Sequence, residues 1–351
     1  MGNIKNELEN KDNTIKMLIY GPEHSRKTWW TGLLATLNYN VIYLNSDNGL
    51  SILKQIPEAY LDNITAINIS DFPDRAVAFD FMGLLAQHKP FSWNNTKRIQ
   101  GTLKNASIGE EIISIIPKNL SSSDVIILDS FTSLVDSSIT SYGIVNNTPM
   151  DDADLFDWNY YYREQQALNY LLRSLISLPC HVIVIAHELK TDIMKRIGDK
   201  DKKVGEETII MSSSKNHAKS IARMFSDILH FEIQDGGRIF ISNARMKNKI
   251  SGSRVRPPVT ETWKDLGPDK FFPKSELPSE HFPIIITKKT EILEDKDKEI
   301  SSEVSMIIGE ITNELNPTSF TNANSTKSAN NSIKPTIGQT VSLKTSIKGT
   351  L

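Results

Sequence analysis

The most informative part of the chain is Met17-Leu18-Ile19-Tyr20 followed at once by Gly21-Pro22-Glu23-His24-Ser25-Arg26-Lys27-Thr28. The apolar run predicts a buried strand, and residues 29–37 predict a helix after the loop. Successive backbone N–H groups in such a loop form an anion-binding nest at the start of the helix. In this motif the Lys ammonium reaches the outer phosphates and the Thr hydroxyl binds Mg²⁺. We therefore predict that residues 21–28 and the adjoining Trp29 bind a nucleotide.

One residue departs from the phosphate-loop pattern G-x-x-x-x-G-K-[ST]. Arg26 stands where the pattern has glycine. Glycine suits this position because the backbone can approach phosphate closely, and a non-glycine residue with positive φ costs about 1–2 kcal/mol. An arginine can offset part of this cost by pairing with phosphate. The departure weakens the prediction of nucleotide binding without removing it.

Further short apolar runs alternate with longer mixed segments along the chain. Four of them are expected to be buried parallel strands, at residues 41–44, 64–69, 125–128 and 182–185. Continuous apolar runs are typical of parallel strands covered by helices on both faces. Residues 228–233 and 238–242 flank Gln234-Asp235-Gly236-Gly237 and predict an antiparallel hairpin. The expected fold class is α/β, with a mostly parallel sheet, helices on both faces and an antiparallel hairpin at the edge.

Composition excludes several classes of protein. The 351 residues include 40 Lys and Arg against 42 Asp and Glu, a formal net charge of −2, so the chain is not uniformly basic and a polyanion must meet local basic patches. The single cysteine, Cys180, cannot form an internal disulfide or a cysteine-rich zinc site, which favours a reducing compartment. No apolar run approaches the ~18–20 residues of a membrane span, and the polar N-terminus lacks a signal-peptide pattern. A cytoplasmic protein with no membrane partner is expected.

Four parts are expected along the chain. Residues 1–15 form a polar N-terminal segment and residues 16–287 the α/β core. Residues 288–316 are charged, with apolar residues at helical spacing, and predict an amphipathic helical extension. Residues 317–351, rich in Ser, Thr, Asn and Lys, bury too little apolar surface to offset their ordering entropy and predict a disordered tail. Inside the core, residues 137–157 predict a long loop whose carboxylates form a solvated face, followed by a helix at residues 158–178.

Residues 21–28 resemble the phosphate-binding loop of the RecA family, G-P-E-S-S-G-K-T, and the similarity continues in chain order. The stretch V-I-Y-L-N-S-D at 41–47 is similar to the family's second strand, and V-I-I-L-D-S-F-T-S-L at 125–134 is similar to its Mg²⁺-binding strand. The stretch V-I-V-I-A-H-E-L-K at 182–190 is similar to the γ-phosphate sensor strand, and R-M-K-N-K-I at 245–250 to the K-N-K-I segment. Over residues 16–260 the chain looks like a RecA-like P-loop NTPase. Within this group the chain resembles phage recombinases of the single-strand-annealing type and the phage AAA-type ATP-binding proteins grouped with them.

The resemblance implies a role for each matching residue. The candidate catalytic residues are Asp47, His187, Lys247 and Lys249, and the candidate metal ligands are Thr28 and Asp129. Asp47 would polarise the attacking water, although it is shorter than the usual Glu, and His187 would sense the γ-phosphate. The two lysines would reach the nucleotide of a neighbouring subunit. Judged from the residues alone, Asp47 also fits a turn and His187 a structural hydrogen bond, but both follow predicted strands, at the edge where open α/β sheets bind ligands.

Two basic segments lie where RecA-like proteins have mobile DNA-binding loops. The first, residues 190–204, is diluted by carboxylates. The second, residues 212–223, has no carboxylate and begins with S-S-S-K-N-H-A-K before a short predicted helix. Lys and Arg contacts with phosphate give an affinity that is independent of sequence and falls with salt. A solvated loop is the alternative, because stacking aromatics, which many single-strand binders use, are scarce. The candidate DNA-binding residues are Lys190, Lys195, Arg196, Lys215 and Lys219.

These observations predict an ATP-binding and ATP-hydrolysing protein that uses Mg²⁺ and acts on single-stranded DNA in phage recombination or annealing. It would form a ring or filament of identical subunits in the host cytoplasm. Arg26 and Asp47 also fit a nucleotide-binding assembly protein that has lost hydrolysis, and the same core serves helicase or packaging motors. The tail could dock a single-strand-binding protein, but docking tails are usually acidic and this one is basic, which favours a tether or a weak DNA contact.

Overall fold

The computed structural model describes residues 14–47, 49–72, 74–95, 110–146, 158–197, 200–234, 237–244, 249–254, 256–262, 264–276 and 283–289. The expected N-terminal segment, helical extension and C-terminal tail lie outside these ranges, except for residues 14, 15, 288 and 289. In the described ranges, no helix has the length and apolar character needed to cross a membrane.

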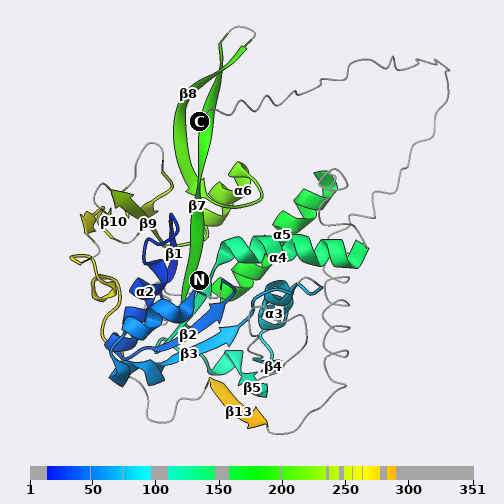
Figure 1. Ribbon diagram of the computed structural model, residues 1–351, viewed down its shortest axis with the longest axis vertical. Helices are drawn as coiled ribbons and strands as arrows, with labels where there is room; N and C mark the ends of the chain where they lie inside the picture. Colours follow the sequence, from blue (N-terminus) through cyan, green and yellow to red (C-terminus); the bar gives the residue numbers. More distant parts are fainter. Residues whose placement is uncertain are drawn as a thin grey trace, which may run out of the picture. The chain divides into compact units, whose positions relative to one another are not determined.

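A mostly parallel sheet forms the centre of the core (Figure 1). Its parallel strands stand in the order β9, β1, β7, β6, β2 and β3. They span Asp227–Gln234, Lys16–Gly21, His181–Ile197, Asp124–Asp129, Asn40–Asn45 and Ile64–Asn68, respectively. Strands β1, β2 and β6 are buried on both faces, as continuous apolar runs require. The predicted parallel strands are therefore confirmed.

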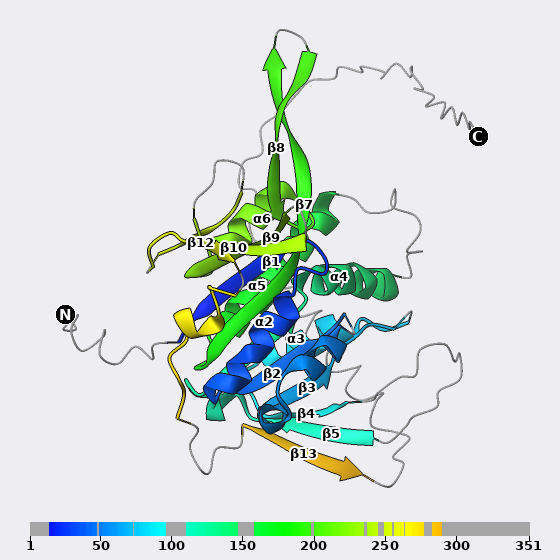
Figure 2. The same cartoon turned by 60° about the vertical axis from the view of Figure 1, so that its left-hand side comes forward.

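The edge of the sheet is antiparallel, as predicted. Strand β9 pairs with β10 (Arg238–Ser242), which pairs with β12 (Thr260–Thr262), and β11 (Gly252–Ser253) also pairs with β9. A second, antiparallel sheet has the strand order β13, β5, β4 (Figure 2). These strands span Ile284–Lys289, Glu110–Ile115 and Phe91–Asn94.

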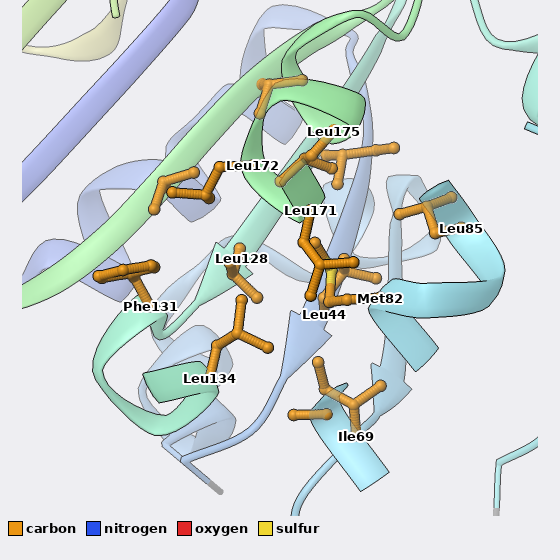
Figure 3. Packing of buried hydrophobic residues seen from close by; sticks show 14 of the residues in the cluster. Leu44, Ile69, Met82, Leu85, Leu128, Phe131, Leu134, Leu171, Leu172 and Leu175 are labelled. Carbon is orange, nitrogen blue, oxygen red and sulfur yellow. The ribbon is translucent and has the colours of Figure 1, made fainter. Parts of the chain in front are cut away.

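Helices cover both faces of the main sheet, which confirms the expected layering. On one face lie α3 (Val77–Ala86), α4 (Phe131–Asn146), α5 (Trp158–Ile176) and α6 (Lys215–Ala222). Figure 3 shows Leu44 and Leu128 of the sheet packed among side chains of α3, α4 and α5. The only cysteine, Cys180, is fully buried in the same cluster.

The opposite face is covered by shorter helices. Helix α2 (Lys27–Gly32) continues into the 3-10 helix η1 (Leu33–Leu37), and η2 (Leu50–Gln55), η3 (Glu58–Asn63) and η7 (Pro268–Lys270) follow along the chain. Side chains of α2, η1 and η2, together with Phe271 and Phe272 just after η7, form one cluster with the strand residues Met17, Ile19 and Val41. These strand residues alternate with the ones that face α3–α6, because successive side chains of a strand point to opposite faces. Another 3-10 helix, η4 (Pro117–Asn119), precedes β6.

Two predictions about helices need correction. The loop expected at residues 137–157 is wrong for residues 137–146, which belong to α4. Phe131, Leu134 and Val135 are buried at helical spacing, and this apolar side fixes the helix although Ser and Thr are frequent in it. Residues 147–157, which hold the acidic cluster, lie outside the described chain. The helix expected at residues 29–37 begins two residues earlier, at Lys27, and changes to 3-10 geometry after Gly32.

The loop expected at residues 190–204 is also wrong, because this segment belongs to a β-hairpin. Strand β7 leaves the sheet after His187 and continues to Ile197, and β8 (Lys200–Ile210) returns antiparallel beside it. The register shifts once, between Ile193 and Met194. Figures 1 and 2 show this hairpin extending beyond the main sheet. The sequence carried a signal for it in Gly198-Asp199, a pair typical of two-residue hairpin connections.

Candidate functional site

The loop between β1 and α2 surrounds the ammonium group of Lys27. Its Nζ donates to the carbonyl oxygens of Gly21 at 3.0 Å and Pro22 at 2.7 Å, and to Ser25 Oγ at 3.2 Å. Burial lowers the pKa of Lys27 to about 8, although nearby carboxylates, with Asp129 first, act in the opposite direction. The loop therefore holds a buried cation at the place where phosphate is expected.

Two non-glycine residues of this loop have left-handed backbone conformations. The φ angle is 63° at Arg26 and 59° at His24, and both side chains are exposed. The position where the motif has glycine thus needs positive φ, as the sequence comparison suggested. The Cζ atom of Arg26 lies 5.9 Å from the ring centre of Trp29. At Gly21 the constraint is space: a Cβ atom would lie 2.3 Å from the carbonyl oxygen of Phe231 on β9, so no larger residue fits.

A hydrogen bond joins the loop to the end of β6. Thr28 Oγ1 donates to Asp129 Oδ2 at 2.6 Å. Asp129 is only 5% exposed, and burial raises its pKa to about 6, although the bond from Thr28 lowers it in part. The backbone N–H and the hydroxyl of Ser46 both donate to the carbonyl oxygen of Asp129, which fixes the ends of β2 and β6 together.

Thr28 and Asp129 fit a magnesium site. A hydroxyl and a carboxylate are hard oxygen ligands, and Mg²⁺ in nucleotide sites is usually bound through one or two carboxylates with phosphate and water completing the shell. No cluster of three or more His, Cys, Asp or Glu side chains suited to a metal occurs among the described residues. The pair therefore suits a metal that arrives with phosphate.

The structure brings Asp47 and His187 into contact. Asp47 Oδ2 lies 3.5 Å from His187 Nε2, and Asp47 Oδ1 accepts a very short hydrogen bond from Ser133. Burial raises the pKa of Asp47, but the hydrogen bonds from His187 and the two serines nearby outweigh it, so the net shift is downward. His187 itself is in register with Gly21 on β1, and its backbone N–H donates to Thr132 Oγ1 at 3.0 Å. These two predicted site residues thus lie beside the loop.

The other predicted site residues lie in different surroundings. Lys249 Nζ is 2.6 Å from Glu232 Oε2 of its own chain, and Lys247 lies outside the described ranges. Lys215 in the first turn of α6 and Lys219 in its last turn both pair with Glu207 of β8. The remaining three DNA candidates, all on β7, are exposed: Lys190, Lys195 and Arg196.

Sequence reasoning missed a third carboxylate at this edge of the sheet, besides Asp47 and Asp129. Glu188 Oε2 lies 2.8 Å from Nε2 of His230 on β9, and their side chains are 13% and 3% exposed. Ser46, Thr132 and Ser133, which bind the backbone and side chains of the site, were missed as well. The available signal was position, because Glu188 directly follows His187 at the end of the predicted strand.

The comparison with known families agrees with this geometry. A family model described as an AAA domain matches residues 13–255, a span that contains the loop and the ends of β2, β6 and β7. Among curated proteins, none matches the chain. The matched span is more than half of the chain, and the α/β sheet with its phosphate-binding loop has the architecture expected of such a domain. The chain therefore belongs to the AAA domain family, whose members are nucleotide-binding P-loop ATPases.

Proposed function

We propose that the protein binds ATP together with Mg²⁺ at residues 21–28 and hydrolyses it. The observation that carries this proposal is the 2.6 Å hydrogen bond between Thr28 Oγ1 and Asp129 Oδ2, beside the buried Lys27 ammonium. Phosphoryl transfer needs little covalent chemistry from the protein, because positioning and charge stabilisation supply most of the catalysis. A cation, a hydroxyl and a carboxylate at one loop are the groups that this task requires.

Each residue would have a separate task. Lys27 would contact the β- and γ-phosphates, while Thr28 and Asp129 would hold Mg²⁺, which when bound neutralises charge that develops on the phosphates. His187 would respond to the γ-phosphate, since it is anchored by Thr132 at the point where β7 leaves the main sheet and is paired with Asp47. The family resemblance assigns the task of polarising the attacking water to Asp47, whose two oxygens contact Ser133 and His187.

We propose single-stranded DNA as the substrate of the β7–β8 hairpin. Lys195 lies directly opposite Lys202, so two like charges face each other across the strands, an arrangement that a polyanion would stabilise. Lys203, by contrast, is already paired with Asp192 and Glu206. Backbone phosphate is the chemistry that such cations recognise, without regard to base sequence.

The resemblance to phage annealing recombinases supports a finer proposal. The reaction on DNA would be recombination or annealing, carried out by a ring or filament of identical subunits. In such an assembly Lys247 and Lys249 would approach the neighbour's nucleotide. Because Lys249 is bound to Glu232 in its own chain, this pair would have to open on assembly.

A second candidate function is nucleotide binding without hydrolysis. Both oxygens of Asp47 are engaged, by Ser133 and by His187, and Arg26 replaces the glycine of the motif. Such a protein would bind ATP and assemble without turnover. A helicase or packaging motor of the same core would instead translocate along duplex or tailed DNA.

The test is phosphate release from ATP with and without single-stranded DNA, for the natural chain and for Lys27→Ala. We expect DNA-stimulated release that falls at least about 100-fold in Lys27→Ala, because the cation is lost from the transition state. Lys54→Ala, an exposed lysine on η2, is the control and should keep the natural rate. ATP binding without Lys27-dependent release would contradict hydrolysis and support the second candidate.

A further inference from the structure

Glu188 directly follows His187 on β7, and its charge acts on the loop residue Lys27. Strand β1 lies between β7 and β9, with Gly21 in register with His187 and Tyr20 in register with His230. Glu188 follows His187, the last residue of β7 that pairs with β1. Its 2.8 Å contact with His230 therefore reaches across the end of β1 from one neighbouring strand to the other.

His230 holds this carboxylate in a fixed orientation. The His230 side chain is 3% exposed, and its ring packs on Tyr20 with 4.7 Å between ring centres. Only Oε2 of Glu188 is bound to it; in the described part of the chain, Oε1 has no hydrogen-bond partner. The carboxylate is thus oriented through one oxygen while the other is left to accept a proton.

Asp47 is placed less favourably for the same task. Its side chain is one methylene shorter, and its two oxygens already contact Ser133 and His187. Among the carboxylates that favour the charged Lys27, Glu188 also acts more strongly than Asp47. A general base must reach the reacting water with an unengaged oxygen, and Glu188 has one.

We propose that Glu188, oriented by His230, is the catalytic carboxylate that accepts a proton from the attacking water. The proposal rests on the ATP hydrolysis proposed above. The water oxygen bonds to the γ-phosphorus, and the bond from that phosphorus to the β,γ-bridging oxygen breaks, with its electron pair leaving on ADP. The water proton passes to Glu188 Oε1 and from there to the released phosphate. His230 is a positioning residue in this scheme.

The test compares single-turnover hydrolysis and the Kd of a fluorescent ATP analogue in Glu188→Gln and Asp47→Asn. We expect Glu188→Gln to lower the hydrolysis rate at least about 100-fold with the Kd changed less than about threefold, since a lost general base affects chemistry and not binding. His230→Asn should lower the rate less, and the double variant should be no slower than Glu188→Gln alone, because the two residues act as a unit. Asp80→Asn, a carboxylate 14% exposed and paired with Arg75 away from the loop, is the matched control and should keep the natural rate.

A second variant separates chemistry from folding. Glu188→Ala should be inactive and regain part of its rate when formate supplies a carboxylate, which loss of structure would not allow. The proposal is overturned if Glu188→Gln turns over at the natural rate, whatever the rate of Asp47→Asn. A natural chain without Lys27-dependent hydrolysis would overturn the proposed function and this inference together. If only this inference fails, the natural chain still hydrolyses ATP, so the two failures are distinguishable.

Discussion

Arg26 shows how one residue can depart from a motif and still satisfy its geometry. Its φ of 63° lies in the region that glycine enters without strain, and its exposed guanidinium lies over the ring of Trp29. The loop keeps the backbone path of a phosphate nest, so the departure costs stability without changing the fold. His24, at 59°, adds a second strained position to the same loop.

Replacing Arg26 by glycine should stabilise the protein. Relief of about 1–2 kcal/mol of left-handed strain exceeds the about 0.4–1 kcal/mol that glycine adds to the entropy of the unfolded chain. We expect the free energy of unfolding in urea to rise by about 0.5–1 kcal/mol. Arg26→Ala removes the guanidinium and keeps the strain, so it should show no such gain. Equal stability of the two variants would contradict the strain argument.

Removing the hydroxyl of Thr28 should weaken the binding of Mg²⁺ at the nucleotide site. Thr28→Val keeps the shape of the side chain but loses the donor to Asp129 and the metal ligand. We expect the Mg²⁺ concentration that half-saturates ATP binding to rise at least about tenfold, the typical effect of a lost ligand contact. Thr36→Val is the control, since its hydroxyl binds only the carbonyl of Leu33 in η1. An unchanged Mg²⁺ titration would remove Thr28 from the metal site.

Helices α4 and α5 meet at a buried acid that the site does not use. Glu164 on α5 is 5% exposed, and its Oε1 accepts a hydrogen bond from Ser138 of α4 at 3.3 Å. Burial raises the pKa of Glu164 to about 7, against a usual 4.5, while Ser138 and Ser213 lower it in part. The folded protein therefore prefers the protonated acid.

This preference predicts how stability changes with pH. Between pH 4.5 and 7 the unfolded chain releases the proton of Glu164 while the folded chain keeps it, so stability falls across this window and stays lower above it. Glu164→Gln should match the natural chain near pH 4.5 and exceed it by about 1–3 kcal/mol at pH 8. Urea unfolding at both pH values measures the difference. The exposed Glu58→Gln is the control, and equal gains at both pH values would exclude titration of Glu164.

Sequence predicted some elements well because their signal is local. Continuous apolar runs such as residues 125–128 can only be buried strands here, and all of those predicted form the parallel sheet. Helix α4 escaped prediction because Ser and Thr break its apolar spacing, while its packing on α3 and α5 depends on contacts distant in sequence. The β7–β8 hairpin was not predicted because charged residues are frequent in both of its strands, whereas a run of apolar residues is the pattern that predicts a strand.

The same distinction applies to the site. Thr28 and Asp129 could be assigned from the sequence, because Thr28 is the last residue of the loop motif and Asp129 directly follows a predicted strand. The structure joins the two residues by a hydrogen bond. The pair of Glu188 and His230 could not, since it depends on β7 and β9 lying on either side of β1, a strand order that one sequence does not contain. Asp47 and His187 were both named, but their contact follows only from the fold.

Strand β7 connects the nucleotide site with the proposed DNA site without interruption. It pairs with β1 up to His187, then with β8 from Glu188 to Ile197. A movement or ordering of the hairpin when DNA binds therefore acts on the backbone that carries His187 and Glu188. A strand of this kind gives a direct physical link between the two sites.

The hairpin should carry most of the salt-sensitive affinity for DNA. Lys195→Gln with Lys202→Gln removes two cations, so the slope of log K against log salt should shrink by about 1.4, at about 0.7 per phosphate contact on a single strand. Anisotropy of a labelled oligonucleotide over a salt series measures this slope. Lys89→Gln with Lys118→Gln removes two exposed lysines elsewhere and should leave it unchanged. Equal slopes in both pairs would place the DNA site away from the hairpin.

The burial of Cys180 makes the protein convenient for spectroscopy. It is the only thiol in the chain, and its side chain is fully buried. Because burial also raises the pKa of the thiol, a maleimide dye should not react with it in the folded protein. A single cysteine introduced at exposed Met194 on the hairpin would then be labelled alone. A dye there, read against a fluorescent nucleotide, would report hairpin movement in real time, with the natural cysteine kept in place.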